Sequence, residues 1–123
     1  MSNSNNSDEK RIKMVIKFDT ILNNLRLSKI IEKSIYNYTI DTAKRRNITR
    51  LWNDRVFYNL YMNKCISIYS NLKEDTYIKN NYLLKNILDK KIDPEKIANL
   101  AVYDIFPDNW KELMDKKSKM DEL

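Results

Sequence analysis

The sequence of 123 residues contains no glycine and no histidine, and it has only two prolines and one cysteine. Without glycine, the tight turns of most β-hairpins, which need a positive φ angle, can be built only with Asn or Asp. The absence of glycine also excludes a glycine-rich loop that binds phosphate groups. The composition therefore favours a helical fold.

Residues for catalysis and metal binding are also scarce. Without histidine, the chain lacks the usual general base near neutral pH and the commonest metal ligand of proteins. The single thiol, Cys65, can form neither an internal disulfide nor a cysteine zinc cluster, and no histidine can activate it as a nucleophile. Glu74 with Asp75, and Asp108 with Glu112, show no sign of a shared carboxylate site. We therefore expect that the chain is not an enzyme and that it binds no metal or cofactor.

The charge and hydropathy of the chain indicate its partners and location. Its 23 Lys and Arg residues against 17 Asp and Glu residues give a net charge of +6, and its pI is about 9.3. This balance favours an acidic partner, either nucleic acid or an acidic protein surface. No apolar run approaches the roughly 20 residues of a membrane span, and the first residues contain no secretory signal. We expect an intracellular monomer that does not enter membranes.

The chain is long enough for one domain with tails. Its 42% hydrophobic residues can form a single modest core. The predicted parts are a disordered polar tail (1–10), an N-terminal extension (11–27), a helical domain (28–115) and a charged tail or start of a linker (116–123).

The N-terminal extension has a mixed pattern. Every second residue from Ile12 to Phe18 is apolar, as in a strand, whereas Ile21 and Leu25 fit a helix. We favour a helix, because no partner strand is evident elsewhere in the sequence.

Two long amphipathic helices are predicted in the domain. The first runs from Ser28, which can serve as the N-cap, to Lys44. Its apolar stripe consists of Ile31, Ile35, Tyr38 and Thr42. The second helix has the stronger pattern, and its stripe consists of Phe57, Tyr61, Cys65, Ile68 and Leu72, widened by Val56 and Leu60.

Short helices follow. Asn80 or Asn81 can cap one that carries Leu84, Ile87 and Leu88. The start signal of the next helix is clearer. Asp93 can accept hydrogen bonds from the unpaired amides of the first turn, and Pro94 lies at a position whose N–H has no partner within the helix. This helix is expected to bury Ile97, Leu100 and Ala101. A last helix is predicted to begin at Pro107, with Trp110, Leu113 and Met114 on one side. These elements predict an all-α fold, a three-helix bundle with additional short helices.

A basic segment links the two long helices. It contains Lys44, Arg45, Arg46 and Arg50, and Trp52 lies close by. Cations beside an aromatic residue are typical of nucleic-acid contacts. They are equally typical of a solvated helix C-terminus, where positive charge offsets the helix dipole, with the aromatic residue in the core. The sequence leaves both interpretations open, as contact with nucleic acid or with an acidic surface.

A family resemblance rests on the order and spacing of many positions between residues 30 and 117. The matching residues are Tyr69-Ser70-Asn71-Leu72-Lys73, Asn81, Leu84, Ile87-Leu88, Ile92 and Pro94, Ile97-Ala98, Leu100 and Trp110. Together they closely resemble the central domain of transcription elongation factor S-II (TFIIS). In that pattern a glycine precedes the Ile-x-Pro segment, where this chain has Asp89 or Lys90.

The resemblance implies a helical domain that binds a DNA-dependent RNA polymerase through cationic residues near the end of its long helix. Of the alternating cationic positions there, Lys64 is matched, while Met62 and Ile66 occupy the other two. Lys64 and Lys73 are therefore the candidate polymerase-binding residues. The zinc ribbon of the family, with four cysteines and an acidic pair that serves RNA cleavage, has no counterpart, so zinc is expected only in a ribbon outside this chain.

Three functions follow as hypotheses. The chain is the polymerase-binding part of an S-II-like elongation factor, which supports rescue of arrested polymerase when joined to a zinc ribbon following residues 116–123. Alternatively, it is a polymerase-associated interaction module without cleavage stimulation, or a basic helical domain that binds nucleic acid by itself. We expect it at a site of transcription, the nucleus or, for a viral protein, the viral factory or virion.

Overall fold

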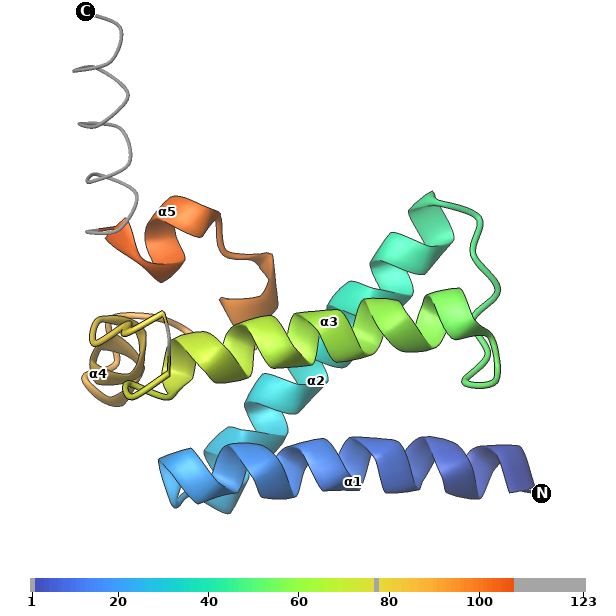
Figure 1. The fold of residues 1–123 in the computed structure, drawn as a ribbon, viewed down its shortest axis with the longest axis horizontal. Coiled ribbons are helices and arrows are strands. Elements are labelled where there is room, and N and C mark those ends of the chain that lie inside the picture. The colour runs from blue at the N-terminus through green and yellow to red at the C-terminus, as the bar shows by residue number, and fades with distance from the viewer. Residues whose placement is uncertain (1, 77, 108–123) are drawn as a thin grey trace, which may run out of the picture.

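The computed structural model describes residues 2–76 and 78–107, with side chains described from Glu9 onward except at positions 102 and 103. Its elements are α1 (Ser2–Leu22), α2 (Leu25–Arg45), α3 (Arg55–Leu72), α4 (Leu83–Leu88), the 3-10 helix η1 (Pro94–Asn99) and α5 (Val102–Ile105) (Figure 1). No strand occurs within these residues, and the all-α prediction is confirmed. Across the same residues, no helix has an apolar stretch long enough to cross a membrane.

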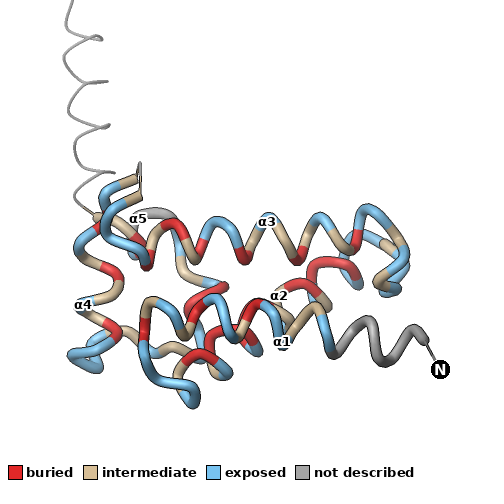
Figure 2. The backbone as a smooth tube through the Cα atoms, turned by 60° about the horizontal axis from the view of Figure 1, so that its bottom comes forward, coloured by how far each residue is buried: buried red, intermediate tan, exposed pale blue. Residues whose placement is uncertain are grey.

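Three long helices form the body of the molecule. Helices α1 and α3 run in the same direction, and α2 runs obliquely from the end of α1 and passes behind α3 in the view of Figure 1. Buried positions recur on the inner sides of all three helices (Figure 2). The core consists of Met14, Phe18, Leu22, Ile31, Ile35, Tyr61, Cys65, Ile68, Leu72, Leu83, Ile87, Ile97, Ala98 and Ile105.

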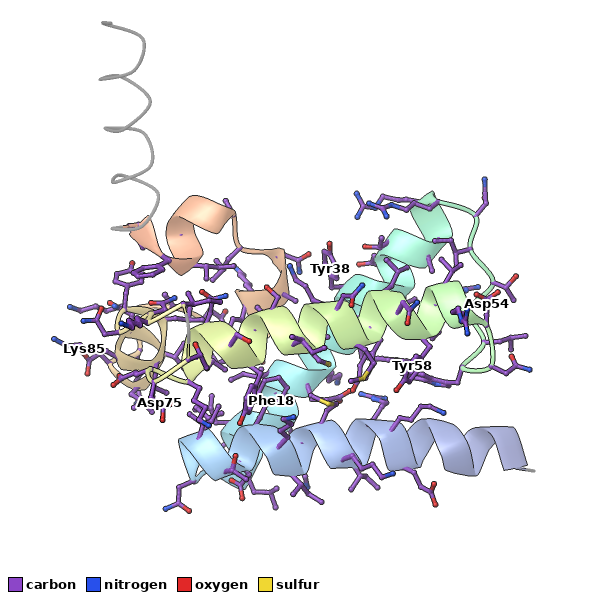
Figure 3. The ribbon with its side chains drawn as sticks, viewed as in Figure 1. Phe18, Tyr38, Asp54, Tyr58, Asp75 and Lys85 are labelled. Atoms are coloured by element: carbon purple, nitrogen blue, oxygen red, sulfur yellow. The ribbon has the colours of Figure 1, made fainter. Side chains whose placement is uncertain are left out.

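Helix α1 confirms the helical interpretation of the N-terminal extension and reaches further back than expected. Buried Met14, Phe18 and Leu22 recur every four residues, the period of a helix rather than of a strand. Phe18 lies between α1 and α3, with its ring centroid 6.3 Å from that of Tyr69 (Figure 3). The helix begins at Ser2, within the segment for which we expected a disordered tail. Once packing fixes a helix, adding residues at its end costs little, because each brings its own hydrogen bond. The domain boundaries given above stay a prediction.

Helix α2 starts earlier than its apolar pattern indicated. Asn23 takes a left-handed conformation (φ 49°), and the side chain of Asn24 accepts a hydrogen bond from the amide of Leu27 at 3.0 Å. Asn24 is therefore the N-cap, and Ser28 is instead buried in the first turn, where its hydroxyl donates to the carbonyl of Asn24 at 2.8 Å. Two asparagines provide here the turn and the cap that often involve glycine.

Helix α3 matches its predicted stripe. Every residue of the stripe is essentially inaccessible to solvent, namely Phe57, Tyr61, Cys65, Ile68 and Leu72. Asp54 caps the helix by accepting hydrogen bonds from the amides of Val56 and Phe57 at 2.9 and 3.2 Å. The inclusion of Val56 in the stripe was wrong, because its side chain lies on the solvent side of the first turn and is 54% exposed.

Asn80 joins three elements of the C-terminal half. Its side-chain carbonyl accepts hydrogen bonds from the amides of Tyr82 and Leu83 at 2.9 and 3.2 Å, in the turn that leads into α4. Its amide group donates to the backbone carbonyl of Ile105 at 2.9 Å and to the side chain of Asn71 at 3.1 Å. The N-cap position of α4 is Tyr82 and neither predicted cap, because Asn80 binds the turn before the helix instead; Asn80 also holds the end of α3 near α5.

The turn between α4 and η1 contains a lysine where glycine is usual. Lys90 is left-handed (φ 61°), and the amides of Lys90 and Lys91 bond to the carbonyls of Ile87 and Asn86 at 3.1 and 2.8 Å. This is the pattern of a Schellman helix end, in which the left-handed position favours glycine. A residue with a Cβ atom costs about 1 kcal/mol there.

The predicted start at Asp93 and Pro94 is confirmed. Asp93 accepts a hydrogen bond from the amide of Glu95 at 2.9 Å, and the helix that follows, η1, is a 3-10 helix. It packs on α2 through buried Ile97 and Ala98, and the amide of Ala98 donates to the hydroxyl of Ser34 at 3.1 Å. Ala101 is exposed, contrary to expectation, because the helix ends before it. The last predicted helix, apart from Pro107, lies outside the described residues.

The two neighbouring asparagines allow a matched test of this structure. Replacing Asn80 by Ala should lower the free energy of unfolding by about 2–4 kcal/mol, because it removes several hydrogen bonds and leaves buried polar groups unpaired. Chemical denaturation followed by circular dichroism measures the change. Asn81→Ala is the control, because Asn81 is exposed, and it should stay within about 0.5 kcal/mol of the parent. Equal effects of the two substitutions would contradict the role of Asn80.

Candidate functional site

A buried carboxylate lies where α1, α2 and α3 meet. Glu32 of α2 is 3% exposed, and Arg11 of α1 approaches it with two nitrogens, Nε to Oε2 at 2.9 Å and Nη2 to Oε1 at 2.8 Å. From α3, the hydroxyl of Tyr61 donates to the same Oε2 at 2.7 Å. A buried charge needs such partners, because its desolvation is costly when it is unpaired. The three side chains therefore fix the three helices relative to one another.

Aromatic rings surround this junction. The guanidinium carbon of Arg11 lies 3.9 Å from the ring centroid of Tyr36, a cation–π arrangement, and Tyr36 stacks on Trp52 at 6.3 Å. The indole of Trp52 also makes edge contacts with Phe57 at 5.2 Å and Tyr61 at 4.8 Å. Trp52, which is half-buried, is thus part of the packing around the junction.

Burial holds the hydroxyl of Tyr61 and the nearby thiol of Cys65 in their protonated forms. Burial, followed by the proximity of Cys65 and Glu32, raises the pKa of the Tyr61 hydroxyl far above its ordinary value. Burial also raises the pKa of the Cys65 thiol to about 12, so that the thiolate is scarce near neutral pH. The hydrogen bonds to Glu32 raise the pKa of Arg11 and keep it charged. The junction therefore stabilises the fold and offers no activated nucleophile.

A metal site is not evident either. Among the side chains that the structure describes, no three of His, Cys, Asp or Glu come together in a way that could hold a metal ion.

The two candidate polymerase-binding lysines lie at different places along α3. The ammonium of Lys64 is 4.4 Å from the ring centroid of Tyr38 on α2, which restrains the side chain at the flank of α3. Lys73 follows the last residue of the helix and is exposed, with its Nζ 3.9 Å from a carboxylate oxygen of Asp75. Nine helical positions correspond to about 13 Å along the axis, so the two lysines do not form one cluster.

The exposed residues of α3 between positions 59 and 67 carry no charge and form a neutral outer face. They are Asn59, Asn63, Ile66 and Ser67. Ile66, which is 54% exposed, adds a large apolar side chain to this face. This neutral face was not predicted, although the uncharged residues at i, i+4, i+7 and i+8 indicate it in the sequence.

The basic segment lies at the C-terminal end of α2 and in the loop that follows it. Lys44, Arg45, Arg46 and Arg50 are all exposed, and Arg45 donates to the hydroxyl of Thr42 at 3.3 Å. Left-handed Asn47 (φ 55°) ends the helix and turns the chain toward α3. This end of α2 extends past α3 on the side away from α1 (Figure 1). In the described part of the chain, no ion pair involves these four residues.

Comparison with known families gives one finding. The family model for the central domain of transcription factor S-II (TFIIS) matches residues 3–122, nearly the whole chain. Comparisons with curated proteins and with solved structures found no match.

Burial of Cys65 predicts a specific dependence of stability on pH. The thiol pKa is higher in the folded than in the unfolded state. The protonated thiol therefore makes its full contribution to the free energy of unfolding below pH 9, and this contribution is lost as the pH rises toward 12. The destabilisation caused by Cys65→Ala should therefore shrink by about 1 kcal/mol between pH 9 and pH 10. Urea denaturation of both proteins under reducing conditions measures the difference. A difference that is constant over this interval would contradict the burial of a protonated thiol.

Proposed function

Because the chain belongs to the family of TFIIS central domains, we propose that it anchors an elongation factor to a DNA-dependent RNA polymerase. The observation that carries this proposal is the extent of the match, which spans residues 3–122 and so includes all the long helices. Membership of the family implies interaction with RNA polymerase and a role in transcription elongation. The surface that makes the contact is our own assignment.

We assign the contact to α3 and its C-terminal end. Lys73 is exposed and pairs with Asp75 only at 3.9 Å, so it is free to exchange that partner for an acidic group of the polymerase. Lys64 is already oriented by Tyr38, which lowers the entropy lost on binding. Ile66 lies between the two lysines in the sequence and adds apolar area to the contact. Charge would then steer the encounter, and the neutral face would contribute most of the buried surface.

The further steps of the proposal concern the rest of the factor. We propose that the domain positions a zinc ribbon, carried outside this chain, which supports rescue of arrested polymerase. The domain itself would act by binding as a monomer, without catalysis and without a cofactor of its own. It would work at a site of transcription, in the nucleus or, if the protein is viral, in the viral factory or virion.

Binding to the cognate RNA polymerase tests this proposal directly. The purified chain should be retained by immobilised polymerase at 50 mM and at 150 mM salt. Lys73→Glu should weaken retention roughly tenfold, because it reverses a charge at the edge of the contact. Lys33→Glu is the control, because Lys33 is an exposed lysine of α2, and it should bind like the parent chain. Absence of binding at both salt concentrations would refute polymerase anchoring.

The exposed cations at the end of α2 support a second candidate, direct binding of nucleic acid. Lys44, Arg45, Arg46 and Arg50 are free of ion pairs in the described part of the chain. The position of Trp52 in the aromatic packing argues against base stacking, so binding would use phosphate contacts alone.

Salt dependence distinguishes this second candidate. If the segment contacts phosphates, the slope of log K against log salt for a DNA duplex should become shallower by about 2 in Arg45→Gln/Arg46→Gln. Fluorescence anisotropy without polymerase provides the measurement, and Lys64→Gln should leave the slope unchanged. An identical slope for the double variant and the parent would exclude this segment as the binding site.

A further inference from the structure

An apolar groove lies at the end of the molecule that carries α4, away from the surfaces discussed above. The turn between α1 and α2 and the segment after α4 lie at this same end (Figure 1). The groove has a volume of about 540 Å³, within the range of sites that bind small molecules or peptide side chains. Its apolar lining consists of Leu27, Ile30, Ile87, Leu88, Ile92 and Pro94.

The exposure of Leu88 is the strongest indication that this groove is a binding surface. Leu88 is 55% exposed at the edge of the groove, although it directly follows Ile87, which is buried in the core. Leu25, which precedes the groove residue Arg26, is 52% exposed as well. Large apolar side chains exposed beside an apolar concavity are typical of binding surfaces rather than of a solvated helix end.

The charges around the groove have one dominant sign. Three cations, Arg26, Lys90 and Lys91, line it together with a single acid, Asp93. The carboxylate of Asp93 is engaged as the cap of η1, and in the described residues no ion pair involves any of the three cations. An apolar cavity with a cationic rim is complementary to an apolar group flanked by carboxylates.

We propose that this groove binds an acidic segment of a partner protein, with a large apolar side chain of that segment inside the groove and its carboxylates against Arg26, Lys90 and Lys91. A peptide fits better than a nucleic acid, because the lining is aliphatic and contains no aromatic residue on which a base could stack. The site does not depend on the α3 surface or on polymerase binding, so either proposal can fail without the other.

Lys90 provides a variant that separates binding from folding. Because Lys90 is left-handed, Lys90→Gly removes a rim cation while relieving backbone strain. Lys79 is also left-handed (φ 56°) but does not line the groove, so Lys79→Gly is the matched control. Both variants should raise the melting temperature by a few degrees.

The probe is a fluorescein-labelled peptide of ten residues in which glutamates flank a central Phe-Leu pair, with the full 123-residue chain as receptor. In fluorescence anisotropy at 50 mM salt, Lys90→Gly should bind about threefold more weakly than the parent, whereas Lys79→Gly should bind equally well. Leu88→Glu should weaken binding more than tenfold, because it places a negative charge at the apolar edge. A peptide with lysines in place of the glutamates should not bind measurably.

Three results would overturn the proposal. One is equal affinity for the acidic and the basic peptide, and another is unchanged affinity in Lys90→Gly. The third is displacement of the acidic peptide by an equimolar oligo-dT, which would assign the rim to phosphate binding instead. Amide chemical shifts on titration with the acidic peptide should change around Ile87 and Ile92 and leave the α3 face unaffected.

Discussion

The buried carboxylate of Glu32 is the interaction on which the arrangement of the long helices depends. It belongs to α2 and is shared by Arg11 of α1 and Tyr61 of α3, with donor–acceptor distances between 2.7 and 3.2 Å. A carboxylate that is 3% exposed is tolerated only while these donors are in place. Apolar packing alone would allow α1 to slide along its neighbours, whereas a two-pronged bond to a guanidinium fixes one register.

The same junction links the interior to the surfaces proposed for binding. Tyr61 precedes Lys64 by about one helical turn, so the contact that holds Tyr61 also sets the rotation of α3 that brings Lys64 over Tyr38. At the other end of α3, the amide group of Asn80 ties Asn71 to Ile105 and steadies the segment before α4. The face that we propose for polymerase binding and the groove that we propose for peptide binding are therefore both built on elements that buried polar contacts keep rigid, and little reorganisation should accompany binding.

How far the sequence predicts this structure depends on the range of the interactions. The stripe of α3 and the start at Asp93 and Pro94 depend on residues a few positions apart, and both were predicted correctly except for Val56. The bond between Arg11 and Glu32 spans 21 positions and leaves no local pattern, so it was missed. The start of α2 was misplaced because apolar periodicity begins only after the asparagine cap. The groove could not be foreseen, since its walls come from segments about 60 residues apart that only the fold brings together.

The absence of glycine has a consequence beyond the turns themselves. All four left-handed positions in the described residues, at 23, 47, 79 and 90, carry Asn or Lys. Glycine codons begin with two guanines, whereas codons for Asn and Lys begin with two adenines. A coding sequence biased toward adenine thus changes the energetics of the backbone, because each left-handed lysine destabilises the fold by about 1 kcal/mol relative to glycine. The nucleotide composition of a gene can in this way reduce the stability of its protein without altering a single packing contact.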